Sequence, residues 1–162
     1  MKRTNYIYTA VLCLFALSSC GQNSSEISNE SAKFEVSKTE EEWKNQLTNV
    51  EYDVLRKAGT EPAFSGKFVD WKKEGVFICK ACENPLFSSA TKFKSGTGWP
   101  SYYDVINESA VVEKTDNKYG WNRTEVICHK CGSHLGHVFE DGPEPTGLRY
   151  CINSVSLGFK EK

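Results

Sequence analysis

Apolar residues are distributed in three ways along this chain, and each pattern predicts a different kind of segment. Residues 6–17 form an almost continuous apolar run, residues 21–33 are nearly all polar, and residues 34–159 mix short apolar groups with polar ones. The first run is too short to span a bilayer as a helix. The pattern therefore predicts a leader, a polar connector and one folded domain, which is as much as 162 residues support.

The start of the folded domain carries helical signals. Apolar residues between positions 43 and 55 recur at the spacing of one helix face. Ser37 with Glu40, and Thr48 with Glu51, have the spacing of capping boxes, in which a side chain bonds the free N–H groups of a helix start. We therefore expect two short helices before residue 60.

Beyond Pro62 the pattern changes to short strands separated by Gly, Asn, Asp and Pro. We expect strands at 68–71, 76–78, 111–112, 124–127, 138–139 and 148–156. The predicted fold class is mainly β: a small antiparallel sheet domain with short N-terminal helices.

Two stretches of the chain repeat one another, and both contain the motif CxxC. Cys79 and Cys82 form the first pair, and Cys128 and Cys131 form the second. In each, an isoleucine precedes the first cysteine and a leucine follows the second by four positions. Four thiolates in two tight turns suit a tetrahedral zinc ion, and a closed set of four indicates one structural zinc per chain.

Disulfides are the alternative for these pairs. In an oxidising compartment each CxxC could close on itself as a redox-active pair. Because the same apolar residues flank both CxxC pairs, the sequence favours a metal site formed where the tips of two hairpins meet. His129 lies between ligands, but four thiolates already complete the site, so we expect it to be exposed.

The N-terminal residues resemble a bacterial lipoprotein leader. Lys2 and Arg3 precede the apolar run, which ends at Leu17-Ser18-Ser19-Cys20. This pattern predicts removal of residues 1–19, lipid on Cys20, a flexible tether over 20–33 and a domain over 34–162, held on the extracytoplasmic, periplasmic side of the bacterial cell envelope. A cleaved signal peptide with an incidental cysteine is the alternative.

Charge and composition narrow the function. The formal net charge is −1, with 39% hydrophobic and 25% charged residues. This is a globular composition, and it has no basic field that would indicate nucleic acid as a partner. We expect a monomer attached to the membrane through its lipid.

Cys151 is the cysteine left over when the leader, the lipid site and the zinc site are assigned. Strand alternation places Arg149, Cys151 and Asn153 on one face. A neighbouring guanidinium favours the nucleophilic thiolate. A free cysteine that fills core space is the alternative.

Two further motifs carry candidate chemistry. His134 and His137 follow the second CxxC among glycines, and an imidazole titrates near neutral pH and can pass a proton. Trp99 lies in the loop Ser95–Ser101, where an indole could form an apolar wall for a methyl or thioether group. The alternatives are structural histidines and a packed tryptophan in a Gly-Pro turn.

The motifs SGTGWPS, the paired CxxC, SHLGHVFEDGP and LRYCINSVSL together resemble the methionine sulfoxide reductase B family over nearly the whole domain. The resemblance implies reduction of the R epimer of methionine sulfoxide in proteins, on a β fold with a four-cysteine zinc site. It makes Cys151 the nucleophile, which becomes a sulfenic acid. It makes His134 and His137 the groups that bind and protonate the oxygen, Arg149 and Asn153 groups that shape the thiolate site, and Trp99 the methyl-binding wall.

The chain departs from many family members at one position. Where they have a resolving cysteine, this chain has Thr97. We therefore expect an external thiol, such as a thioredoxin-like protein, to reduce the sulfenic acid. Two other functions remain open on the sequence: a non-catalytic, zinc-stabilised binding module and a disulfide oxidoreductase that uses the CxxC pairs.

Overall fold

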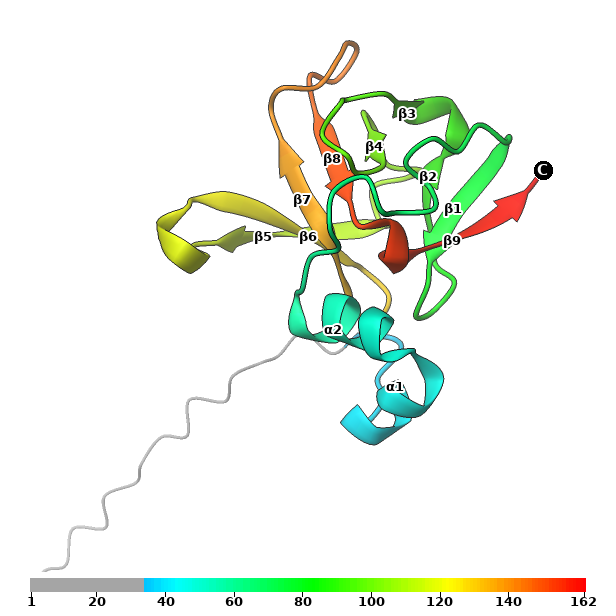
Figure 1. Cartoon of the computed structure of the whole chain (residues 1–162), viewed down its shortest axis with the longest axis vertical. Helices are drawn as coiled ribbons and strands as arrows, with labels where there is room; N and C mark the ends of the chain where they lie inside the picture. The colour runs from blue at the N-terminus through cyan, green and yellow to red at the C-terminus, as the bar shows by residue number, and fades with distance from the viewer. Residues whose placement is uncertain (1–33) are drawn as a thin grey trace, which may run out of the picture. The chain divides into compact units, whose positions relative to one another are not determined.

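The computed structural model describes residues 34–162, apart from the side chain of Tyr119 (Figure 1). The predicted leader over 1–19, the tether over 20–33 and the lipid site at Cys20 lie outside the described residues. Within those that are described, no helix is both long enough and apolar enough to cross a membrane.

The two predicted helices form. They are α1 (Glu40–Gln46) and α2 (Asn49–Lys57). The box predicted at α2 is confirmed, since the Thr48 side chain accepts from the N–H of Glu51. The box predicted at Ser37 and Glu40 is wrong. Thr39 caps α1 instead, because the Glu42 carboxylate reaches back to the Thr39 N–H at 2.7 Å.

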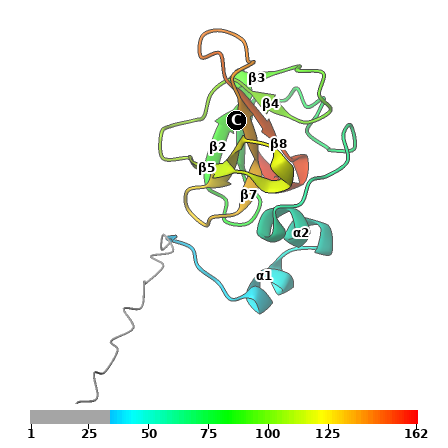
Figure 2. The same cartoon turned by 90° about the vertical axis from the view of Figure 1, so that its left-hand side faces the viewer.

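The strands form two antiparallel sheets (Figures 1 and 2). A three-stranded sheet has the order β2-β1-β9, and a six-stranded sheet has the order β3-β4-β8-β7-β6-β5. The strands are β1 (Gly75–Cys79), β2 (Pro85–Ser88), β3 (Lys92–Phe93), β4 (Ser101–Tyr102), β5 (Val111–Asp116), β6 (Arg123–Cys128), β7 (His134–Phe139), β8 (Arg149–Ile152) and β9 (Leu157–Glu161). Short 3-10 turns are η1 (Ser89–Thr91), η2 (Lys118–Gly120) and η3 (Ser154–Ser156). The mainly-β prediction is confirmed.

The strand predicted over 148–156 forms only over its first half, because the chain changes sheet there. β8 ends at Ile152, η3 follows, and β9 then joins the other sheet. The carboxylate of Glu61 accepts from the backbone N–H groups of Ser154 at 2.6 Å and Val155 at 2.9 Å. These two N–H groups therefore bond a side chain instead of a neighbouring strand.

The strand predicted over 68–71 is also wrong. The segment forms consecutive turns, with N–H groups of Val69 and Trp71 bonded three residues back. The turns bring the rings of Phe68 and Trp71 to 5.2 Å, edge to face. Aromatic packing against Phe77 of β1 thus takes the place of strand pairing.

The core draws on both sheets and both helices. Phe87 of β2 stacks on Tyr102 of β4 at 4.3 Å, which joins the three-stranded sheet to the six-stranded one. Trp43 of α1 is 1% exposed, and Leu55 of α2 belongs to the same cluster. This core holds the ends of β1, β6 and β7 in place, where the two CxxC motifs lie.

Candidate active site and metal centre

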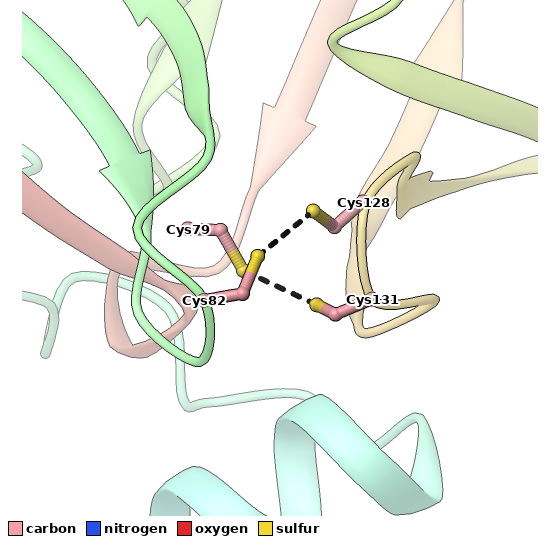
Figure 3. A group of neighbouring side chains, drawn as sticks. All are labelled: Cys79, Cys82, Cys128 and Cys131. Atoms are coloured by element: carbon pink, nitrogen blue, oxygen red, sulfur yellow. Dashed lines mark hydrogen bonds between the residues drawn. The ribbon is translucent and has the colours of Figure 1, made fainter. Parts of the chain in front are cut away.

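The two CxxC motifs form matching turns, one between β1 and β2 and one between β6 and β7 (Figure 3). In the first turn the Cys79 carbonyl accepts from Glu83 N–H at 2.8 Å, and in the second the Cys128 carbonyl accepts from Gly132 N–H at 2.8 Å. Glu83 and Gly132 both have positive φ, 60° and 68°. The internal repeat seen in the sequence is therefore also a repeat of backbone geometry.

The four cysteine sulfurs meet between these turns, as Figure 3 shows. All four Sγ atoms lie within 4.8 Å of one another. Cys79 Sγ is 3.8 Å from Cys131 Sγ, and Cys82 Sγ is 3.5 Å from Cys128 Sγ. A disulfide needs about 2.05 Å, whereas four thiolates about 2.3 Å from a tetrahedral metal lie roughly 3.8 Å apart. The cluster fits a metal ion.

The charge state of the cluster also favours a cation. The neighbouring thiols raise the pKa of Cys79 and Cys82 and, by hydrogen bonding to its thiolate, lower the pKa of Cys131. Thiols this close share protons, because several thiolates repel one another. A divalent cation would remove this conflict by binding all four as thiolates.

The helices hold both turns from one side. Gln46 of α1 donates to the carbonyl of Ala81 in the first turn at 2.7 Å. Arg56 of α2 donates to the carbonyl of Cys131 in the second turn at 3.2 Å. His129, between the second pair of cysteines, is exposed as expected.

Cys151 lies outside this cluster, in a row of facing residues across the six-stranded sheet. Ser101 of β4, Cys151 of β8, His137 of β7 and Glu125 of β6 are successive cross-strand partners. Directly opposed side chains on antiparallel strands lie on the same face, with Cβ atoms about 5 Å apart. The sheet therefore sets a hydroxyl and an imidazole on either side of the thiol.

A chain of hydroxyl groups leads to the Cys151 sulfur. Ser101 Oγ is 2.8 Å from Ser95 Oγ, Ser95 Oγ is 2.9 Å from Thr97 Oγ1, and Thr97 Oγ1 is 3.8 Å from Cys151 Sγ. The last distance is within the range of a hydrogen bond to sulfur. Since the serines fix Thr97, its hydroxyl is positioned to donate to a thiolate.

Burial and hydrogen bonding act on the Cys151 thiol in opposite directions. Burial raises the pKa of Cys151, while the Thr97 hydroxyl and the Arg149 guanidinium lower it. Burial is the largest effect, so the pKa lies above its ordinary value. The expectation that Arg149 favours the thiolate is right in direction, but burial outweighs it.

The two histidines lie side by side and each has a carboxylate partner. Their ring centroids are 5.5 Å apart. His134 Nδ1 is 2.6 Å from Glu125, and His137 Nε2 is 2.9 Å from Asp116. Burial lowers the pKa of His137, so its imidazole is neutral at pH 7. His134 Nε2 is buried and has no hydrogen-bond partner in the described part of the chain, a feature that often marks a functional group.

Different partners hold Arg149 and Asn153, the two residues predicted to shape the thiolate site. Arg149 shares the face of Cys151 and is held by Asp141, with Nε–Oδ1 and Nη2–Oδ2 distances of 2.8 Å. Asn153 follows the end of β8 and keeps an extended backbone, with φ of −63° and ψ of 127°. Its amide accepts from Glu61 N–H and donates to the Leu135 carbonyl, both at 3.1 Å.

Trp99 lies in the Ser95–Ser101 loop and is partly buried. Its indole N–H donates to the carbonyl of Glu61 at 3.1 Å. Glu61 therefore contacts the site three times, through Trp99, through Asn153 and through η3. Trp99 lies two residues beyond Thr97, whose hydroxyl contacts the Cys151 sulfur.

Comparisons with known proteins agree with this arrangement. A family model described as the SelR domain matches residues 47–161. Peptide methionine sulfoxide reductase MsrB of Methanosarcina mazei is 59% identical over 131 residues, which is 81% of this chain and 94% of that protein. The protein of the same name from Methanosarcina barkeri is 63% identical, over 77% of this chain and 88% of its own. That of Leptospira interrogans is 51% identical, over 80% of this chain and 98% of its own.

The chain belongs to the methionine sulfoxide reductase B family. The resemblance inferred from the four motifs is confirmed.

Sequence reasoning missed several partners of the candidate residues in this reductase family member. They are Glu61, Asp116, Glu125 and Asp141. Glu125 opposes His137 only because β6 and β7 pair in one register, and Glu61 reaches η3 across more than 90 residues of chain. Only Asp141 had a local signal, since it belongs to the motif SHLGHVFEDGP.

The raised pKa of Cys151 gives a test. Only the thiolate reacts with iodoacetamide, so alkylation of Cys151 should still accelerate on going from pH 7 to above pH 8. Thr97→Val removes the hydroxyl that stabilises the thiolate and should slow alkylation at pH 8 at least about threefold. Mass spectrometry of the Cys151 peptide measures the rate.

Thr97→Ser is the matched control, because it keeps the hydroxyl and should alkylate at nearly the wild-type rate. A rate that is already constant between pH 6 and pH 8 would show that burial does not dominate at Cys151.

Proposed function

We propose that this protein reduces methionine-R-sulfoxide in proteins to methionine, with Cys151 as the nucleophile. The row of cross-strand partners carries the proposal, because it sets the half-buried thiol beside the His137 imidazole. The family supports the reaction, since the similar proteins are named peptide methionine sulfoxide reductases. Trp99 supplies an apolar wall for the methyl group.

The chemical step transfers the sulfoxide oxygen to the cysteine sulfur. The Cys151 sulfur attacks the sulfoxide sulfur as a thiolate, and the oxygen is protonated. The S–S bond made by this attack and the sulfoxide S–O bond both break as an S–O bond to Cys151 forms, which gives methionine and a sulfenic acid. The thiol proton ends on the sulfenic hydroxyl, so atoms and electrons balance.

The histidines supply the proton path. The neighbouring donors lower the pKa of Asp116, so it is ionised at pH 7 and accepts from His137 Nε2–H. Neutral His137 then keeps Nδ1 free to receive the thiol proton. The unpartnered Nε2 of buried His134 is a second polar group for the sulfoxide oxygen. Together they move the proton from sulfur to oxygen.

Arg149 and Asn153 act around the nucleophile. Burial opposes loss of the Cys151 proton, and Arg149 stabilises the thiolate that results. Asp141 keeps the guanidinium of Arg149 in place. Asn153 holds the end of β8 against Glu61 and Leu135. We assign Asn153 a positioning role.

An external dithiol, such as a thioredoxin-like protein, completes the cycle. Cys151 is the only cysteine of the described residues outside the four-sulfur cluster, and Thr97 faces it where many relatives place a cysteine. One thiol of the donor displaces water from the sulfenic acid, and its second thiol releases Cys151 and leaves a disulfide on the donor.

The metal of the cluster is a structural zinc ion in this proposal. Cys79, Cys82, Cys128 and Cys131 would hold it, and four thiolates leave no open position for substrate. When bound it would offset half of the charge on the four thiolates and would tie the two hairpins together. The second turn leads directly into His134, so the metal sets the start of the histidine strand.

The membrane attachment completes the proposal. We propose that residues 1–19 are removed, that Cys20 carries lipid, and that a monomeric domain over 34–162 works on the extracytoplasmic side of a bacterial envelope, on a tether over 20–33. The order of charges, apolar run and Leu17-Ser18-Ser19-Cys20 supports it. Several acyl chains are needed for firm attachment, since one alone binds membranes weakly.

The reaction is tested with a methionine-R-sulfoxide substrate and dithiothreitol. Wild type should reduce the R epimer, and Cys151→Ser should lower the rate by at least about a thousandfold, since the hydroxyl is a poor nucleophile at neutral pH. The S epimer is the control and should not be reduced. Wild-type protein without activity would favour the binding module, and an active Cys151→Ser variant would move the chemistry elsewhere.

The zinc ion is tested by elemental analysis of purified protein. We expect about one zinc per chain and loss of the cooperative unfolding transition on treatment with a strong chelator, because such sites contribute on the order of 10 kcal/mol to folding. Cys82→Ser should lower the zinc content, whereas Cys151→Ser should keep it. Disulfides within each CxxC in freshly purified, zinc-free protein would contradict the proposal.

The lipid anchor is tested by expressing the full chain in a bacterium. Wild type should fractionate with membranes and carry an acylated N-terminal cysteine by mass spectrometry, while Cys20→Ala should not be acylated. Cys13→Ala is the matched control and should behave as wild type. A mature protein that starts at another residue and carries no lipid would favour the plain signal peptide.

A further inference from the structure

The loop after α2 holds one aromatic residue in an unfavourable state. Phe64 is 71% exposed and has φ of 63°, in the left-handed region that favours glycine. A bulky residue with positive φ is uncommon and strained, and an exposed ring gains little from burial. Folding alone gives no reason for phenylalanine at this position.

Phe64 lies against the loop that carries the candidate site. Its N–H donates to the Gly98 carbonyl at 2.8 Å, and the segment after α2 can be followed toward this loop in Figure 1. A Cβ built on Gly98 would lie 2.9 Å from Phe64 Cδ2, so the ring edge touches the Gly98 backbone. Gly98 separates Thr97, which contacts Cys151 Sγ, from Trp99.

The loop is held firmly enough to keep this strain. Glu61 accepts the Trp99 indole N–H through its carbonyl and donates its own N–H to Asn153 at 3.1 Å. Ser65 Oγ donates to the Pro62 carbonyl at 2.7 Å, which closes the turn around Phe64. The ring is therefore held at a fixed place beside Gly98, the residue before Trp99.

We propose that Phe64 is a specificity-determining residue that binds an apolar side chain next to the methionine sulfoxide of a protein substrate. The inference rests on the proposed function and deepens it, by assigning sulfoxides within exposed apolar segments as the preferred substrates. Free methionine sulfoxide has charged amino and carboxylate groups where such a neighbour would be, so it gains nothing from the ring. Aromatic surfaces at rigid positions are common anchors for apolar side chains.

The test compares two substrates on wild type, Phe64→Gly and Phe64→Leu. One is a short peptide with leucine on both sides of methionine-R-sulfoxide, and the other is N-acetyl-methionine-R-sulfoxide. Phe64→Gly should raise KM for the leucine peptide about tenfold, the effect of losing one partly buried aromatic contact. Its kcat, and both constants for the small substrate, should stay within about twofold of wild type. Phe64→Leu should have a KM for the leucine peptide between those of wild type and Phe64→Gly.

Thermal unfolding and a matched variant separate this from a structural effect. Phe64→Gly should not lower Tm, because glycine takes positive φ without strain. Ala58→Gly relieves a similar strain, φ 54°, at the end of α2 and should leave both substrates unaffected. Equal effects of Phe64→Gly on both substrates, or none on either, overturn the inference while the reductase activity stands. Wild type inactive on both substrates removes the function on which it rests.

Discussion

The meeting of four cysteine sulfurs between two hairpins is the constraint on which the rest of the structure depends. One hairpin, β1–β2, belongs to the three-stranded sheet, and the other, β6–β7, belongs to the six-stranded sheet. Hydrophobic packing joins the sheets without fixing their register, whereas four ligands to one ion allow only a narrow geometry. The turn that supplies Cys128 and Cys131 also leads into β7, so the position of the four-sulfur cluster fixes the position of His134 and His137.

A buried carboxylate organises the other side of the site. Glu61 bonds the N–H groups of η3, while its backbone bonds Asn153 and the indole of Trp99. Burial raises the pKa of Glu61, but the two N–H groups oppose that rise by favouring the charged form. One residue thus joins the end of the nucleophile strand, the crossing between sheets and the substrate loop.

The environment of Cys151 suits a thiol that is activated during the reaction rather than at rest. Burial keeps the proton on sulfur, and Thr97 and Arg149 lower the cost of losing it. His137 is neutral for the same reason, since burial disfavours its charged form. A half-buried neutral pair next to polar partners can transfer a proton when substrate arrives, and a resting thiol is oxidised more slowly than a thiolate.

The sequence alone determined the features that local chemistry fixes. The spacing of apolar residues and the Thr48–Glu51 cap predicted the helices. The two CxxC motifs predicted the four-cysteine cluster, and the four motifs predicted the family. The structure differs from the prediction at the cap residue Thr39 and at the turns over 68–71, because neighbouring side chains offered better partners there.

Tertiary structure decided everything that depends on residues far apart in the chain. Register across β4, β8, β7 and β6 placed Ser101, Cys151, His137 and Glu125 in one row, and Glu61 broke the predicted final strand. Burial also outweighed the effect of Arg149 on the pKa of Cys151. Pairing partners and burial are properties of the assembled sheets, and no local pattern of residues encodes them.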